Sequence, residues 1–164
     1  MVTKMATGST QTIKEQKEVS VKQYIEKYIM ASVEDLVERE QHLPAFLMIS
    51  CGIEFLGKCI GSKPFGDRDY QGGNFKNALA SFSSLNKYIL NCSIDIYTNL
   101  RCGIVHSLLP DNNIMLVEGK NNLPNVIGLK DLKDDFITAC NDLLTDVCHM
   151  GDNKSLNDTI CYIS

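Results

Sequence analysis

The stretch Tyr97–Pro110 reads Tyr-Thr-Asn-Leu-Arg-Cys-Gly-Ile-Val-His-Ser-Leu-Leu-Pro, and its apolar residues recur with the period of a helix. On a helix that turns about 100° per residue, the following apolar residues fall within about 100° of one another: Ile94, Tyr97, Ile104, Val105 and Leu108. Arg101 falls in the middle of this apolar stripe. Because a guanidinium is costly to bury and keeps its proton, it needs a carboxylate, a phosphate or a wet cleft beside it.

Two helices are predicted upstream of this stretch. Ser20 and Gln23 match a capping box, and a helix of about twenty residues follows it. Its apolar residues recur at three- and four-residue steps: Val21, Tyr24, Ile25, Tyr28, Ile29, Val33, Leu36 and Val37. The second helix, Pro44 to Ile60, is apolar almost all the way round and should be the buried, central one. Gly52 and Gly57 lower its helix propensity, which is tolerable where neighbouring helices approach closely.

Glu54 is the one carboxylate in this second helix, and two interpretations of it remain open. It can lie at the exposed edge of the helix. Alternatively it pairs with Arg101, since a buried charge is retained only with a hydrogen-bonded counterpart.

The segments between the second helix and the opening stretch read as a loop and a third helix. Gly61 to Gly73 contains Pro64 and four glycines, without the spacing of a phosphate-binding loop, and is predicted to be a plain loop. The third helix is marked by Phe75, Ala78, Leu79, Phe82, Leu85 and Ile89. The fourth helix is predicted from about Ser93 to Leu108 and is ended by Pro110.

The C-terminal third is predicted to hold a small β-ribbon and a last helix. Residues 114–117 and 125–129 are β-prone runs, and a fifth helix should start near Asp131. Its inner face is Leu132, Phe136, Ala139, Cys140, Leu143 and Val147. The predicted fold is therefore all-α: about five helices, with a β-ribbon between the last two. Residues 1–18 form a polar tail, 19–150 the helical domain and 151–164 a C-terminal tail, in which residues 160–163 either dock or fray.

Composition narrows the functional classes. The chain has 164 residues, a net charge of −4 and a pI of about 5.3, which excludes binding nucleic acid by phosphate neutralisation alone but not brief RNA binding in a local positive cleft. Its seven cysteines include no C-x-x-C pair, so we expect reduced thiols and no metal site or cofactor. The N-terminus lacks the apolar core of a signal peptide, and Glu54 and Lys58 interrupt the most apolar segment. The expectation is a cytoplasmic protein without a membrane span.

Arg101-Cys-Gly-Ile-Val-His106 resembles the R-x4–6-H signature of the HEPN superfamily, a group of small helical domains found in many RNase toxins. The order of predicted helices is similar as well, and the resemblance covers roughly residues 20–150. It implies a metal-independent endoribonuclease of the toxin–antitoxin or antiphage type. In that chemistry the ribose 2′-hydroxyl attacks the adjacent phosphate, His106 moves a proton and Arg101 stabilises the growing negative charge. The resemblance also implies a homodimer through the motif helix.

The spacing of the motif sets a condition on this chemistry. Five residues turn a helix by about 500°, so the side chains of Arg101 and His106 leave it about 140° apart and about 7.5 Å apart along the axis. The long arginine arm, a frayed helix end or a second subunit is needed to bring both to one phosphate. By the same geometry His106 shares a polar face with Asp95, Asn99 and Cys102.

The residue after the arginine departs from the pattern of catalytic family members, which usually carry Asn, Asp or His there. Here it is Cys102, and a thiol is a weak hydrogen-bonding substitute. Two functions remain open: a nuclease in which Glu54, Cys102 and Asn99 support Arg101 and His106, and a non-catalytic dimeric scaffold that pairs with a nucleotidyltransferase or another effector. In the scaffold, Arg101 is a structural partner of Glu54, and His106 interacts with the helix C-terminus. An unrelated helical bundle with a small-ligand cleft is the third alternative.

Overall fold

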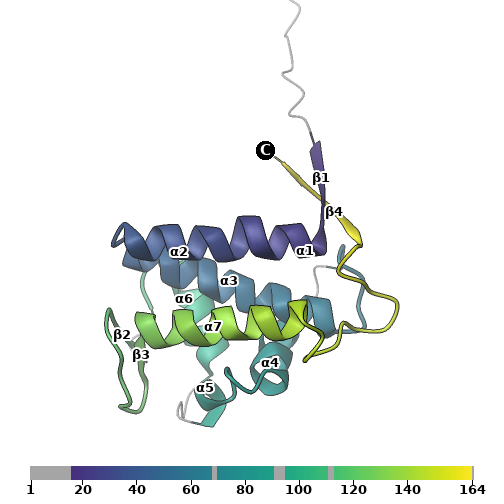
Figure 1. Cartoon of the computed structure of the whole chain (residues 1–164). Coiled ribbons are helices and arrows are strands. Elements are labelled where there is room, and N and C mark those ends of the chain that lie inside the picture. The colour runs from purple at the N-terminus through teal and green to yellow at the C-terminus, as the bar shows by residue number, and fades with distance from the viewer. Residues whose placement is uncertain (1–15, 68–69, 91–94, 111–112, 164) are drawn as a thin grey trace, which may run out of the picture.

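The computed structural model describes residues 16–67, 70–90, 95–110 and 113–163 of the chain. It is mostly helical, as the sequence predicted, and carries two small two-stranded sheets. The helices pack around α3 (His42–Ile60), which contacts the N-terminal helix, α4 and α7 (Figure 1). One sheet lies at each end of this bundle, β1–β4 near α1 and β2–β3 near α6.

The N-terminal helix is continuous and contains a π-helical segment, which has more residues per turn than an α-helix. It consists of α1 (Val21–Gln23), a π-helical segment η1 (Tyr24–Met30) and α2 (Ala31–Glu38). The predicted capping box is confirmed: the Gln23 amide donates to Ser20 Oγ at 3.1 Å and the Ser20 amide to Gln23 Oε1 at 3.4 Å. The buried residues recur at every fourth position: Val21, Ile25, Ile29 and Val33. In a π-helix each backbone hydrogen bond spans five residues, so the chain turns by a smaller angle per residue than in an α-helix. This smaller angle helps to keep residues four positions apart on one face.

Helix α3 is the central element that the sequence predicted, and its glycines are where neighbours come close. A side chain at Gly52 would meet the ring of Phe136 in α7, and one at Gly57 would meet the backbone of Asn74 in α4. By length and composition α3 is also apolar enough to cross a membrane, and half of that stretch is buried inside the fold. No other helix of the described residues meets that test.

The predicted third helix is broken in two, so this part of the prediction was wrong. α4 (Gln71–Ser81) ends where Phe82 becomes extended, and α5 is the short segment Lys87–Leu90. Phe82 and Leu85 are both buried, and the Ser84 hydroxyl between them donates to the Asp135 carbonyl of α7 at 2.9 Å. These tertiary contacts outweigh the local helical pattern. Ile89 consequently lies 46% exposed instead of in the core.

The fourth helix also differs from the prediction in its phase. It consists of η2 (Tyr97–Cys102), again π-helical, and α6 (Gly103–Ser107), and it ends at Leu108 in a left-handed conformation with φ 55°. Its predicted start near Ser93 lies outside the described residues. The buried face is Ile96, Leu100 and Ile104, whereas Val105 and Leu108 of the predicted stripe are 40% and 65% exposed. As in η1, the π-helical segment rotates by a smaller angle per residue than an α-helix, which favours a buried face made of every fourth residue.

The predicted β-ribbon between the last two helices is present. β2 (Met115–Val117) pairs with β3 (Val126–Gly128), and the pairing is parallel. Helix α7 (Leu129–Leu144) follows directly and buries the predicted inner face. Val147 was assigned to that face wrongly: it lies beyond the helix end and is 71% exposed.

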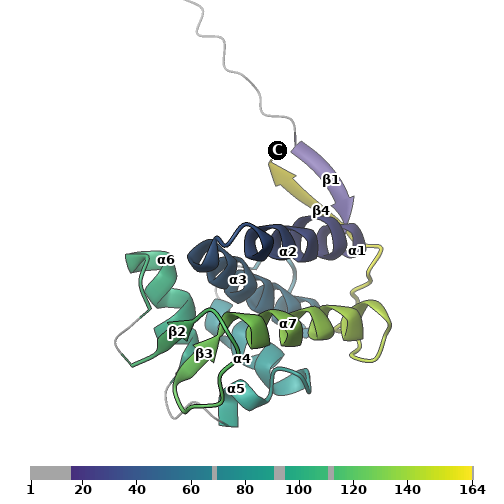
Figure 2. The ribbon, with the colours of Figure 1, turned by 60° about the vertical axis from the view of Figure 1, so that its left-hand side comes forward.

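The two ends of the described chain pair with each other. β1 (Gln16–Ser20) runs antiparallel to β4 (Thr159–Ile163), with Gln16 opposite Ile163. The segment before β4 is fixed to the end of α3, because the Lys154 ammonium donates to the carbonyls of Lys58 and Gly61. Of the two alternatives for residues 160–163, docking is therefore the correct one. Figure 2 shows the β1–β4 pair standing out from the helical bundle. Residues 1–15 of the predicted N-terminal tail lie outside the described residues.

Candidate functional site

The ion pair between Arg101 and Glu54 is the centre of the candidate site. Arg101 extends from η2 toward α3, and its Nε lies 2.9 Å from Glu54 Oε2. The two side chains are only 14% and 17% exposed. Of the two interpretations of Glu54, pairing with Arg101 is therefore confirmed. The sequence could suggest this pair because Glu54 is the one carboxylate in its apolar segment and Arg101 is the one arginine or lysine in the other.

The ion pair is close but imperfectly aligned. Both Nε and Oε2 are buried, and neither forms a hydrogen bond of acceptable angle, although the two atoms are at ion-pair distance. Burial lowers the pKa of Arg101, but the nearby Glu54 carboxylate, with smaller contributions from Tyr97, Cys51 and Cys102, raises it more. The net effect is a raised pKa, so the guanidinium is held in its charged form by its surroundings.

Tyr97 is the residue near Arg101 whose role the sequence analysis missed. It lies one helical turn before Arg101, whose guanidinium carbon is 5.7 Å from the centre of the tyrosine ring, within the range of a cation–π contact. The ring also packs against Phe75 of α4, with centroids 5.4 Å apart. Burial, followed by a hydrogen bond to Cys102, raises the pKa of Tyr97. The predicted supporting residue Cys102 thus contacts the tyrosine rather than an open site.

Asn99 has a structural role. It is 7% exposed, its side-chain amide donates to the Asp95 carbonyl at 2.8 Å, and its Oδ1 accepts from Asn113 Nδ2 at 3.4 Å. Asp95 itself caps the helix start by accepting from the Tyr97 amide at 3.1 Å and pairs with Lys76 of α4 at 3.1 Å. These contacts tie the helix to α4 and to the segment before β2, and they engage both the nitrogen and the oxygen of the Asn99 side-chain amide.

His106 lies apart from this cluster. It is in α6 near the helix end, and its side chain is exposed. Within the described residues no hydrogen bond or ion pair joins it to Arg101, Asp95, Asn99 or Cys102. Among the described residues, the imidazole is thus bonded neither to the predicted polar face nor to Arg101, and the joint action of the two motif residues stays a prediction.

Around His106 the surface is apolar, and this feature was not predicted. We define the α6 docking surface as Val105, Leu108, Leu109 and Met115, which are 40%, 65%, 66% and 62% exposed. Beside it lies a hollow of about 510 Å³. Among the residues that the structure describes, those that line it carry no charged side chain: Leu109, Pro110, Asn113, Ile114, Met115, Pro124, Asn125 and Val126. Sequence reasoning missed the surface because it assigned helical apolar residues to the core.

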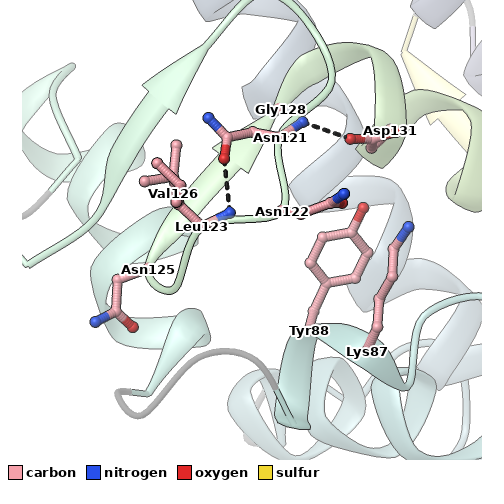
Figure 3. Close-up of a pocket in the computed structure, with 9 residues that line it drawn as sticks. All are labelled: Lys87, Tyr88, Asn121, Asn122, Leu123, Asn125, Val126, Gly128 and Asp131. Carbon is pink, nitrogen blue, oxygen red and sulfur yellow. Dashed lines mark hydrogen bonds between the residues drawn. The ribbon is translucent and has the colours of Figure 1, made fainter.

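A second hollow lies between α5 and the loop that joins β2 to β3 (Figure 3). Hydrogen bonds order this loop: the Asn121 amide donates to Asp131 Oδ2 at 2.8 Å and the Leu123 amide to Asn121 Oδ1 at 2.7 Å. The hollow measures about 40 Å³, far below the roughly 300–1,000 Å³ of ordinary ligand pockets. We therefore interpret it as a small packing gap beneath the loop and not as a ligand-binding pocket.

Comparison with known proteins adds no further information about this site. No family model, no curated protein and no solved structure matches the chain. The functional argument therefore depends on the geometry described above.

Proposed function

We propose that this chain is a non-catalytic, HEPN-like interaction module that forms a homodimer through the α6 docking surface. The observation that carries the proposal is the ion pair of Arg101 with Glu54. A guanidinium with a carboxylate 2.9 Å away, in a setting only 14% exposed, has a charged counterpart inside the fold, although the two atoms are not aligned for a hydrogen bond. It needs no RNA phosphate to explain its place in the fold.

The α6 docking surface supports the interaction function. Clustered exposed apolar side chains often mark protein-binding sites, because their burial removes apolar area from water. Three of the four residues of the surface are more than 60% exposed. The scaffold function requires a surface of this kind, and the Arg101 region does not provide one.

A second copy of the chain is the occupant that the surface suits best. Leu108 and Leu109 are exposed at the helix end, and Leu109 lines the hollow. An exposed apolar side chain and a hollow on the same face are what a two-fold contact requires, since each copy then fills the hollow of the other. Two acidic chains, each of net charge −4, repel each other, but the four described residues that define this surface carry no charge to oppose their approach.

Light scattering with size-exclusion chromatography tests the dimer. We expect the wild-type protein to have the mass of a dimer at micromolar concentration, and Leu109→Lys to have that of a monomer because a buried lysine would lack a partner. Ile89→Lys is the matched control, since Ile89 is an exposed apolar residue of α5 outside the surface. A monomeric wild type, or equal effects of the two substitutions, would contradict the proposal.

The exposure of His106 favours a second candidate function, the endoribonuclease. A two-fold contact through the α6 docking surface would bring the imidazoles of two copies close together, and the contact of Arg101 with Glu54 is made through Nε. Labelled single-stranded RNA incubated with the protein in EDTA distinguishes the two candidates. The interaction module predicts intact RNA with both wild type and His106→Ala. Cleavage by the wild type that disappears in His106→Ala would establish the nuclease instead.

A further inference from the structure

The outer edge of β4 is an unpaired strand edge. β4 pairs with β1 on one side, and among the described residues no third strand joins this sheet. No backbone hydrogen bond links residues 160–163 to a described segment other than β1. The two strands stand out from the helical bundle, and no described helix covers this edge (Figure 2). The backbone N–H and C=O groups along it are therefore open to another strand.

The two strands of this sheet differ in the residues that would protect an open edge. Natural proteins place charged residues, above all lysine, or proline in an exposed edge strand, because both oppose the addition of a further strand. β1 contains Lys17 and Glu18. β4 reads Thr-Ile-Cys-Tyr-Ile and contains neither a charged residue nor a proline, and four of its five residues are β-branched or aromatic types that favour strands. Only β1 therefore has the composition of an edge that stays free.

We propose that β4 pairs with β4 of a second copy of the chain, so that the two sheets form one four-stranded antiparallel sheet. Identical strands related by a two-fold axis normal to the sheet run antiparallel, and a strand without charge meets no like charge in any register. With the axis at Cys161, Ile160 lies opposite Tyr162 of the partner subunit, an aromatic and β-branched pair of the kind that stabilises sheets. A two-stranded sheet is only marginally stable, and the second copy supplies the additional strands that it lacks.

The β4 contact is separate from the α6 docking surface. The β1–β4 sheet and the β2–β3 sheet beside α6 lie at opposite ends of the bundle (Figure 1). A strand of five residues shares few hydrogen bonds with its partner, so the β4 contact should be the weaker of the two and form at higher protein concentration. The β4 contact stands on the strand edge alone. One consequence rests on the function proposed above: copies joined through both contacts form assemblies longer than a dimer.

Sedimentation velocity on the Leu109→Lys variant tests the β4 contact by itself, because that substitution removes the proposed α6 contact. We expect a monomer at micromolar and a dimer at millimolar concentration. Adding Cys161→Lys should keep the protein monomeric throughout, because the two-fold axis places the two introduced charges opposite each other. The sheet within one chain should persist, since Glu18 of β1 lies opposite position 161 and supplies the opposite charge.

Gln16→Lys in the same background is the matched control. It adds the same charge to β1, opposite Ile163, and should leave the millimolar dimer intact because the outer edge of β4 is unchanged. Circular dichroism verifies that each variant is folded.

Cross-linking then identifies the register. Bis-maleimidoethane, which joins two thiols, should give the Leu109→Lys protein a covalent dimer at millimolar concentration, and adding Cys161→Ser should abolish that product. The proposal is overturned if Leu109→Lys stays monomeric at millimolar concentration, if Cys161→Lys and Gln16→Lys weaken association equally, or if the cross-link does not require Cys161. Failure of the proposed function looks different: the wild type would be a monomer at micromolar concentration, and the comparison of these variants at millimolar concentration would be unaffected.

Discussion

Arg101 and Glu54 show how a charge within an apolar helix face can be tolerated. The pair joins η2 to α3. Burying the two charges removes their favourable hydration, and their mutual attraction offsets only part of this loss. Exposed pairs such as Arg39–Asp35, 66% and 53% exposed at 2.8 Å, contribute little by comparison. The loss of stability should therefore be large when one residue of the Arg101–Glu54 pair is replaced and small when both are replaced.

A double-mutant cycle on this pair tests that expectation. Glu54→Leu alone leaves a poorly hydrated guanidinium without its partner and should lower the free energy of unfolding by about 2 kcal/mol. Arg101→Met alone should have a similar effect, and the double variant should recover most of the loss. Urea denaturation at pH 7 measures all four proteins. If the two single effects simply add, the residues are not coupled and the pairing is incidental.

At the residue scale, sequence reasoning succeeded where a residue was chemically out of place. Glu54 and Arg101 each stand out as a charged residue in an apolar segment. Because an unpaired buried charge is costly, this alone was enough to suggest that the two residues pair. Asn99 and Cys102 gave no such signal, because their partners are Asp95 and Asn113 for the first and Tyr97 for the second. These contacts depend on the wide turn of η2 and on the chain folding back before β2.

At the scale of elements, the close approach of α3 and α4 depends on the absence of a side chain at Gly57. An added Cβ there would collide with the backbone of Asn74, which cannot move aside as a side chain can. The same helix approaches α7 at Gly52, where the neighbouring atoms belong to the Phe136 ring and can adjust. The two glycines therefore differ in how strictly they are required.

Alanine substitutions make this difference measurable. Gly57→Ala should lower the free energy of unfolding by about 2 kcal/mol or more, because α3 and α4 must separate. Gly66→Ala is the control: nothing lies within 4 Å of the added Cβ, so the change should stay within about 0.5 kcal/mol. Thermal and urea denaturation report both values. Equal stability of the two variants would show that α4 can shift without cost.

Most of the helices could be predicted from the sequence, but their exact phase and ends could not. Ser20 and Gln23 gave the start of the first helix, and the apolar periodicity gave α3 and α7. The calculation that assigned Val105 and Leu108 to the core assumed 100° per residue, whereas η2 is π-helical. Likewise, no local pattern marks Phe82 as a helix end, because the competing contacts come from α7, more than forty residues later.

At the scale of the whole molecule, β1 pairs with β4. The local pattern of apolar residues in the sequence cannot predict this pairing, because the two strands lie far apart along the chain. Each strand is five residues long, and the two are separated by almost the entire chain. A two-stranded sheet is only marginally stable alone, so its support comes from the adjacent contacts at α1 and at the end of α3. The Val21 amide donates to the Asp158 carbonyl at 2.9 Å, and Gly151 donates to the Cys59 carbonyl at 2.9 Å.

Removing residues 159–164 tests how far the bundle depends on this sheet. We expect unchanged helical content and a melting temperature lower by a few degrees, corresponding to about 1–2 kcal/mol. Val19→Pro, which disrupts β1 opposite Ile160, should produce a similar loss. The two changes combined should cost no more than either alone, because both remove the same pairing. Loss of the helical circular-dichroism signal would show instead that the bundle requires the strands.

The antiparallel register of β1 and β4 has a mechanical consequence. Gln16 lies opposite Ile163, so a load applied to both outer ends pulls on one residue pair at a time, as when a zipper is opened, instead of shearing the whole ladder at once. In an optical-trap experiment with handles at the two ends, the sheet should therefore yield first and at low force. The helical bundle should then resist separately, giving a second rupture at higher force.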